Sequence, residues 1–311
     1  MTITRPDGFS LVELLIAMTV CAFLSAAMAA VVVPARAAFD TTPAALDLHQ
    51  RGRTGVDVLA TALRSAGADV ASAAELGALA EAMPPVMVLS PSTEDDERFE
   101  ALYVVSPVVR ASEGVLDRHQ SGAQGPLRLA TGPGCPAVDD VCGFTPGAVA
   151  AIVDGTGRFD VFTVASTSIS RRELVPASAL TAAYPAGSVV VEVEANDFHL
   201  LDQSDGSRSL VRETAGGAVQ PIVDHVAAMG IEAWGGRPLM RYGGSDFEDG
   251  PWLEGGPHGN YDADFGALRR IDLWIRVEAS SAPLRNPAGG AVLRWIPDRT
   301  FHASVALRNV P

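Results

Sequence analysis

The sequence contains no lysine. All 23 basic residues are arginine, against 37 aspartates and glutamates, and the formal net charge is −14. A chain with this excess of carboxylates repels phosphate backbones, and it has no basic stretch of the kind that follows a nucleic acid. We therefore expect no nucleic-acid partner.

Familiar catalytic motifs are also missing. The chain has no Gly-x-Ser-x-Gly nucleophile elbow, no Gly-Lys-Ser/Thr phosphate loop and no His-Glu-x-x-His zinc motif. The six histidines stand singly, whereas a metal site needs several ligands at matched spacing. We expect a protein that is not an enzyme, with no catalytic residues and no cofactor.

Cysteine is scarce, and its three residues are of two kinds. Cys21 lies within an apolar block, where a free thiol behaves as a small hydrophobe. Cys135 and Cys142 lie in a loop-like stretch rich in glycine and proline, and we predict that they form a local disulfide. Such a bond needs an oxidising compartment, which fits export of this part of the chain.

An apolar block covers residues 9–33, with Glu13 as its one charge. As a helix this block would be roughly 38 Å long, enough to cross a hydrocarbon core of about 30 Å. A secretory signal has a shorter apolar region with a small residue after it, but here the conspicuous small residue, Gly8, comes first. A plain signal anchor would explain the length of the block.

A plain anchor would not explain Glu13, because a carboxylate at mid-membrane costs on the order of 2.5–3.5 kcal/mol. One interpretation is that Glu13 lies near the interface, where it snorkels or stays protonated. The other is that it has a partner. The surrounding residues favour the second.

Residues 8–18 read Gly-Phe-Ser-Leu-Val-Glu-Leu-Leu-Ile-Ala-Met, which resembles the prepilin signature of type IV pilins and type II secretion pseudopilins. The resemblance implies that a membrane peptidase removes the leader, residues 1–8, by cutting between Gly8 and Phe9, and that it methylates Phe9. It also implies that Glu13 faces the N-terminal amine of a neighbouring subunit. Opposite charges removed from water together cost less than either alone, so Glu13 is expected to be an assembly residue.

Flanking charge does not fix the orientation in the membrane, because Asp7 offsets Arg5 and Arg36 follows the apolar block. The resemblance places the leader in the cytoplasm, the anchor in the inner membrane and the body in the periplasm, or at the cell surface once a filament is assembled. The partners it implies are prepilin peptidase and other pilins or pseudopilins.

A stem helix is expected within residues 34–80, after the anchor. Apolar residues recur there near the helical period, at Leu46, Val56, Leu59 and Leu63. Residues 53–67 resemble the stem end of minor pilins of the PilW type and pseudopilins of the GspJ type.

The body, residues 81–311, consists of short apolar or β-branched runs between turn-forming residues. Alternation with period two, clearest over 188–194 and 268–278, predicts a sheet with one buried face. The candidate strands are 101–109, 126–131, 158–165, 188–194, 209–214, 231–234, 268–278 and 301–308. The last two resemble the C-terminal strands of PilW-like minor pilins. We predict an α+β fold in which a long N-terminal helix packs on a mainly antiparallel sheet.

Three classes of function remain open. The first is a minor subunit that joins or primes a filament in a type IV pilus or a type II secretion pseudopilus. The second is a pilus-borne adhesin or substrate-binding module. The third, a membrane-anchored periplasmic enzyme, is disfavoured by the missing catalytic motifs.

Two acidic stretches, 245–250 and 260–264, suggest a calcium site as a hypothesis. Calcium takes about six to eight oxygen ligands, and some pseudopilins hold it in a loop near their C-terminal strands. The candidate ligands are Asp246, Glu248, Asp249, Asp262 and Asp264. The spacing matches no standard calcium loop, so a solvated acidic loop is the competing and simpler interpretation.

Overall fold

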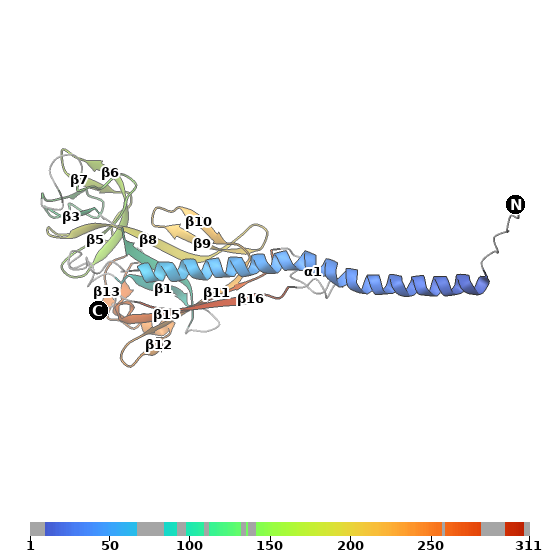
Figure 1. The fold of residues 1–311 in the computed structure, drawn as a ribbon. Helices are drawn as coiled ribbons and strands as arrows, with labels where there is room; N and C mark the ends of the chain where they lie inside the picture. The colour runs from blue at the N-terminus through green and yellow to red at the C-terminus, as the bar shows by residue number, and fades with distance from the viewer. Residues whose placement is uncertain are drawn as a thin grey trace. The chain divides into compact units, whose positions relative to one another are not determined.

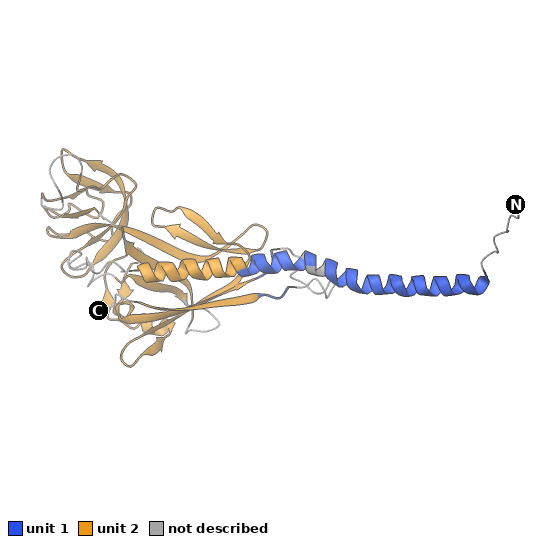
Figure 2. Cartoon of the chain, viewed as in Figure 1, with its two compact units in different colours: residues 1–49, 278–298 blue, residues 50–277, 299–311 orange. Residues whose placement is uncertain are grey.

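The structure, a computed structural model, describes residues 10–66, 84–91, 98–108, 112–131, 135, 141–256, 259–280 and 296–307. The chain divides into two compact units, shown in Figure 2. Unit 1 comprises residues 1–49 and 278–298, and unit 2 comprises residues 50–277 and 299–311. Unit 1 contains the first part of a long helix, and unit 2 contains the end of that helix and the strands.

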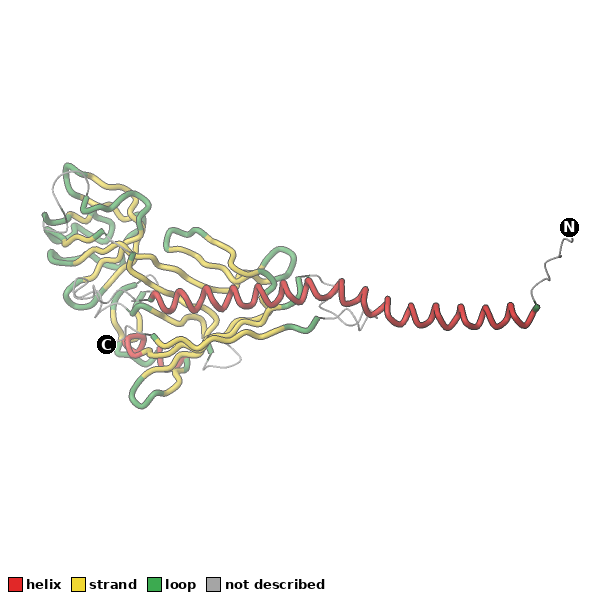
Figure 3. Tube along the Cα trace, in the orientation of Figure 1, coloured by secondary structure: helices red, strands yellow, loops and turns green. Residues whose placement is uncertain are grey.

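A single helix, α1, extends from Leu11 to Ser65 (Figures 1 and 3). The sequence predicts a transmembrane helix over residues 9–33 and a stem helix region over 34–80. In the structure one helix continues through Pro34 and Pro43 over 55 residues, although each proline lacks the N–H that a helix interior uses. The predicted stem beyond Ala66 lies outside the described residues.

The last turns of α1, which belong to unit 2, bury one face. Its buried residues recur three or four positions apart, as one face of a helix requires; they are Gly52, Gly55, Val56, Leu59, Ala60 and Leu63, and Ala66 just after the helix is buried as well. The predicted apolar face is confirmed for Val56, Leu59 and Leu63. Leu46 shares the spacing but is exposed.

Two glycines let α1 approach the strands closely. A Cβ atom added to Gly55 would lie 2.5 Å from Cδ1 of Ile275 and 3.1 Å from Cγ2 of Val223, and one added to Gly52 would collide with the ring of Phe301. Ile275 and Val223 are themselves buried, and a close-packed interior has little room to yield. These glycines weaken the helical pattern in the sequence, yet they are what this packing requires.

The strands of unit 2 pair antiparallel in one large sheet and one small one. The main path of the large sheet follows the order β16-β15-β11-β2-β8-β5-β6-β7-β4. The strands are β1 Val86–Pro91, β2 Phe99–Pro107, β3 Glu113–Val115, β4 Leu127–Arg128, β5 Val149–Val153, β6 Phe159–Ser168, β7 Glu173–Pro176, β8 Val189–Asp202, β9 Arg208–Thr214, β10 Val219–Val223, β11 Val226–Gly235, β12 Met240–Tyr242, β13 Trp252–Leu253, β14 Tyr261–Asp262, β15 Leu268–Val277 and β16 Arg299–Ala306. Two short 3-10 helices, η1 Gly244–Phe247 and η2 Ala263–Ala267, precede β13 and β15.

The predicted α+β fold, with one long N-terminal helix and an antiparallel body, is confirmed. In β15 the predicted alternation is realised, because Ile271, Leu273 and Ile275 are buried while Asp272 and Trp274 are partly exposed. The segment predicted as a strand over 126–131 forms only the two residues of β4.

Strands β3 to β7 form a lobe that lies in the sequence between two paired strands. β2 pairs with the C-terminal part of β8, with Pro107 opposite Val193. We call the described residues between 112 and 188 the insert lobe; they follow β2 in the chain and precede β8. The N-terminal part of β8 pairs with β3 and β5 of this lobe (Figure 1). The lobe has a core of its own, built from Leu116, Leu127, Leu129, Cys135, Val141, Cys142, Phe144, Ala150, Ile152, Phe162, Val164, Leu174, Leu180, Tyr184 and Val190.

Candidate functional site

The N-terminal part of α1 has the properties of a membrane anchor. Among the described residues, α1 is the one helix long and apolar enough to cross a bilayer, with a mean hydropathy of 2.4 over its most apolar 18 residues. None of that window is buried inside the protein. Large side chains such as Leu11, Phe23 and Val31 are more than 70% exposed, and such a helix is stable where lipid covers it.

Glu13 lies in the first turn of α1, at the end of the anchor. Its Oε2 accepts a hydrogen bond from the backbone N–H of Ser10 at 3.0 Å, and Oγ of Ser10 accepts one from the N–H of Val12 at 3.3 Å. The Ser10 hydroxyl thus caps the second residue of the helix, and Glu13 supplies the returning bond of a capping box, so both satisfy donors that the first turn of a helix leaves unpaired. The carboxylate is thereby held at the helix N-terminus, where the helix dipole favours negative charge.

Ser10 is a residue that the sequence-based interpretation missed. The signal was present, because Ser-x-x-Glu before an apolar run is the sequence signature of a capping box. Gly8 and Phe9, the predicted cleavage and methylation positions, lie outside the described residues. Their roles remain predictions.

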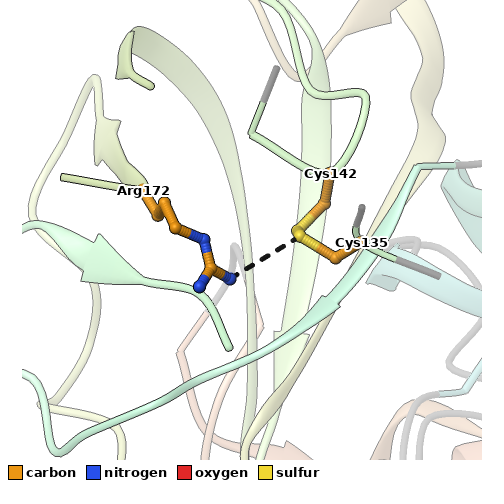
Figure 4. The surroundings of a disulfide bond; sticks show 3 residues. All are labelled: Cys135, Cys142 and Arg172. Carbon is orange, nitrogen blue, oxygen red and sulfur yellow. Dashed lines mark hydrogen bonds between the residues drawn. A yellow bond between two sulfur atoms is a disulfide. The ribbon is translucent and has the colours of Figure 1, made fainter. Parts of the chain in front are cut away.

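The predicted disulfide between Cys135 and Cys142 is present in the structure, with 4.2 Å between the two Cα atoms. Both cysteines are 4% exposed and belong to the core of the insert lobe. Arg172 points its guanidinium at this bond, with Nη2 3.9 Å from Sγ of Cys135 (Figure 4). Cys21 is a free, exposed thiol on the anchor part of α1.

The acidic residues proposed for calcium surround η1 and η2, but two of them already bind backbone groups. Asp246 Oδ2 accepts a hydrogen bond from the N–H of Gly243 at 2.7 Å. Asp262 is fully buried, and its two oxygens accept from the N–H groups of Gly250 and Asp264, at 2.7 and 2.8 Å. These hydrogen bonds hold the backbone of the loop in place.

Asp264 lies close enough to the other carboxylates to be affected by them. Burial raises its pKa, and the charges of Asp262, Asp249 and Asp246 raise it further. In the part of the chain that the structure describes, no group of three or more His, Cys, Asp or Glu side chains could hold a metal ion. The calcium hypothesis remains a prediction.

A buried network in the insert lobe was not predicted from the sequence. Asp160 Oδ2 accepts hydrogen bonds from the N–H and the hydroxyl of Thr181, at 2.9 and 2.8 Å, and from the hydroxyl of Tyr184 at 2.9 Å. Burial raises the pKa of Asp160, and these three hydrogen bonds oppose that rise. Because Oδ2 of Asp160 accepts all three hydrogen bonds, they hold the segment around residue 181 against β6.

Comparison with known families identifies the N-terminal segment. Residues 4–29 match the family described as the prokaryotic N-terminal methylation motif. Neither the curated proteins nor the solved structures give a match to the chain. The motif and the apolar part of α1 together support a type IV pilin-like protein and fit a single-pass membrane anchor. A motif of this class points to a structural role and to contact with other pilins and the processing peptidase.

Proposed function

We propose that the chain is a minor subunit of a type IV pilus or a type II secretion pseudopilus, and that it takes part in filament assembly or initiation. The observation that carries the proposal is the placement of Glu13: a carboxylate that accepts the N–H of Ser10 at the start of an exposed apolar helix within the matched motif. A body of more than 200 residues behind the anchor supports a specialised subunit. The disulfide supports a periplasmic body, because it requires an oxidising compartment.

The mechanism of assembly follows from charge. After cleavage, Phe9 would carry a new N-terminal amine beside the helix that Glu13 begins. An unpaired carboxylate in lipid is costly, and a neighbour's amine at the same depth offsets that cost. The anchor of each subunit is then stabilised in the filament by the next one.

Replacing Gly8 by leucine is expected to block processing, so that the precursor becomes the main species in the membrane. Glycine has no side chain to obstruct the peptidase beside the scissile bond. Intact-protein mass spectrometry distinguishes the precursor from the chain that begins at Phe9. The matched control is Asp7→Leu, one position earlier, which should be cleaved; normal cleavage of the Gly8 variant would contradict the assignment.

Replacing Glu13 by alanine is expected to leave export and cleavage intact but to reduce incorporation into filaments several-fold. The cut depends on the leader junction, whereas docking needs the carboxylate to neutralise an amine. The sheared filament fraction is compared with the membrane fraction by immunoblot. Asp57→Ala, which removes an exposed carboxylate from the same helix outside the anchor, is the control; equal incorporation of both variants would reject the assembly role.

A further inference from the structure

The disulfide of the insert lobe has a charged neighbour. The guanidinium of Arg172 points at the bond, and its Nη2 lies 3.9 Å from Sγ of Cys135 (Figure 4). In the part of the chain that the structure describes, no carboxylate pairs with Arg172. The chain carries a net charge of −14, so carboxylates are abundant, yet this arginine contacts a sulfur atom.

The backbone of Arg172 is held on both sides. Its N–H donates a hydrogen bond to the carbonyl of Ile169 at 3.2 Å, and its own carbonyl accepts one from the N–H of Leu129 at 2.9 Å. Arg172 itself is partly buried, which restricts the side chain as well. The positive charge is therefore kept beside the disulfide.

Two residues of this group have a left-handed backbone. Cys142 and Arg172 each have a φ of 56°, a region that is costly for a residue with a side chain. In the described part of the chain, the other residues besides glycine with positive φ are Ser90 and His225. Residues held in such conformations are most often found where the protein uses them. The disulfide and its arginine are therefore a candidate for a chemical role beyond cross-linking.

A guanidinium stabilises a thiolate far more than it stabilises a neutral disulfide. Burial by itself has the opposite effect, because both cysteines are 4% exposed and an unpaired buried charge is costly. Arg172 offsets that cost at Cys135, since a neighbouring arginine favours the thiolate over the thiol. A disulfide whose reduced form is stabilised in this way is easier to reduce.

We propose that Cys135 and Cys142 form a reversible thiol–disulfide exchange site, which a dithiol reduces and whose reduced form Arg172 stabilises. One thiolate of the dithiol attacks Sγ of Cys142, and the bond between the two cysteines breaks. Its electron pair leaves on Sγ of Cys135, which becomes a thiolate beside Arg172. The second thiol of the dithiol then displaces Cys142, which takes up one proton. The dithiol becomes a disulfide, two electrons pass to the pair, and the second proton goes to solvent.

The exchange couples the redox state of the pair to the stability of the insert lobe. Both cysteines belong to the core of the lobe, and a Cβ atom added to Gly114 would lie 3.1 Å from Sγ of Cys142. Opening the bond removes a cross-link that restricts the unfolded chain. The reduced lobe is therefore less stable than the oxidised one, while the pair of Arg172 with the Cys135 thiolate keeps one sulfur in place.

The test equilibrates the full chain, in detergent micelles, with increasing ratios of reduced to oxidised dithiothreitol. After an acid quench, a maleimide that adds mass counts free thiols in the unfolded chain: the oxidised chain has one, Cys21, and the reduced chain has three. Arg172→Gln removes the charge and keeps a polar side chain, so its midpoint should require a ratio about tenfold higher. Arg172→Lys keeps the charge and should stay close to the natural chain.

The direction of the change separates this role from a structural one. If Arg172 only packed the lobe, its loss would loosen the lobe and make the bond easier to reduce. The control, Arg171→Gln, removes an exposed neighbouring charge and should leave the midpoint unchanged. In the reduced natural chain, iodoacetamide and peptide mapping should find Cys135 modified at lower pH than Cys142. A midpoint for Arg172→Gln at or below that of the natural chain, or Cys142 reacting first, would overturn the proposal.

Discussion

Replacing Gly55 by leucine is expected to lower the free energy of unfolding of the body by about 3 kcal/mol, because overpacking a close-packed interface typically costs 1–3 kcal/mol. The first added carbon already meets Ile275 and Val223, and three further carbons have no space. Either the helix moves off the strands or these side chains leave their preferred rotamers. Urea titration of the detergent-solubilised chain, followed by tryptophan fluorescence, measures the change.

Two matched variants make this result specific. Arg53→Leu adds the same side chain at an exposed position of the same turn and should change stability by less than about 0.5 kcal/mol. Gly55→Ala should fall between Gly55→Leu and Arg53→Leu, because alanine gains about 1 kcal/mol in helix propensity but its Cβ must displace Cδ1 of Ile275 and crowd Cγ2 of Val223. If the leucine variant at Gly55 were as stable as the one at Arg53, the close approach of α1 to the strands would be wrong.

Replacing Asp160 by alanine is expected to destabilise the body by about 3–4 kcal/mol, since a buried donor left without an acceptor costs about 1–3 kcal/mol. The substitution removes the acceptor of three donors at once. Tyr184 is fully buried, so its hydroxyl has no access to water in exchange. The same urea titration reports the loss.

An exposed carboxylate in the same lobe provides the comparison. Asp117 forms an ion pair with Arg128 at 3.2 Å, and both side chains are at least 40% exposed. Asp117→Ala should therefore cost less than about 1 kcal/mol. Asp160→Asn keeps an oxygen at the same place, so its loss in the free energy of unfolding should lie between those of the two alanine variants. Equal losses for Asp117→Ala and Asp160→Ala would mean that the buried network stabilises the body no more than a surface ion pair does.

The features that could be predicted are those specified by residues close together in the sequence. The anchor is visible in one apolar block, and the alternation of β15 is visible in ten consecutive residues. The strand β5 was missed because Val149–Val153 has four consecutive buried residues, a run without alternation that periodicity cannot assign. The continuous course of α1 through Pro34 and Pro43 is not evident from the sequence, because proline disfavours a helix interior.

The remaining features depend on residues that are distant in the sequence. Asp160 meets Thr181 and Tyr184 only because the insert lobe folds back on β6. The packing of Trp274 over Gly230 requires the register of β11 with β15. No spacing rule in a single sequence encodes such pairings, whereas the disulfide closes a short loop and was predictable.

Because of where the insert lobe lies in the chain, the size of the body can change without a change in the strands that pack against α1. Pro107 and Val193 are opposite each other in neighbouring strands, so the chain leaves β2 and returns along β8 across a gap of about 5 Å. A short turn would span the same gap. The polypeptide carried at this junction can therefore lengthen, shrink or be exchanged for another folded module while the strands beneath α1 keep their register, so variation in the length of the chain can be confined to this one junction.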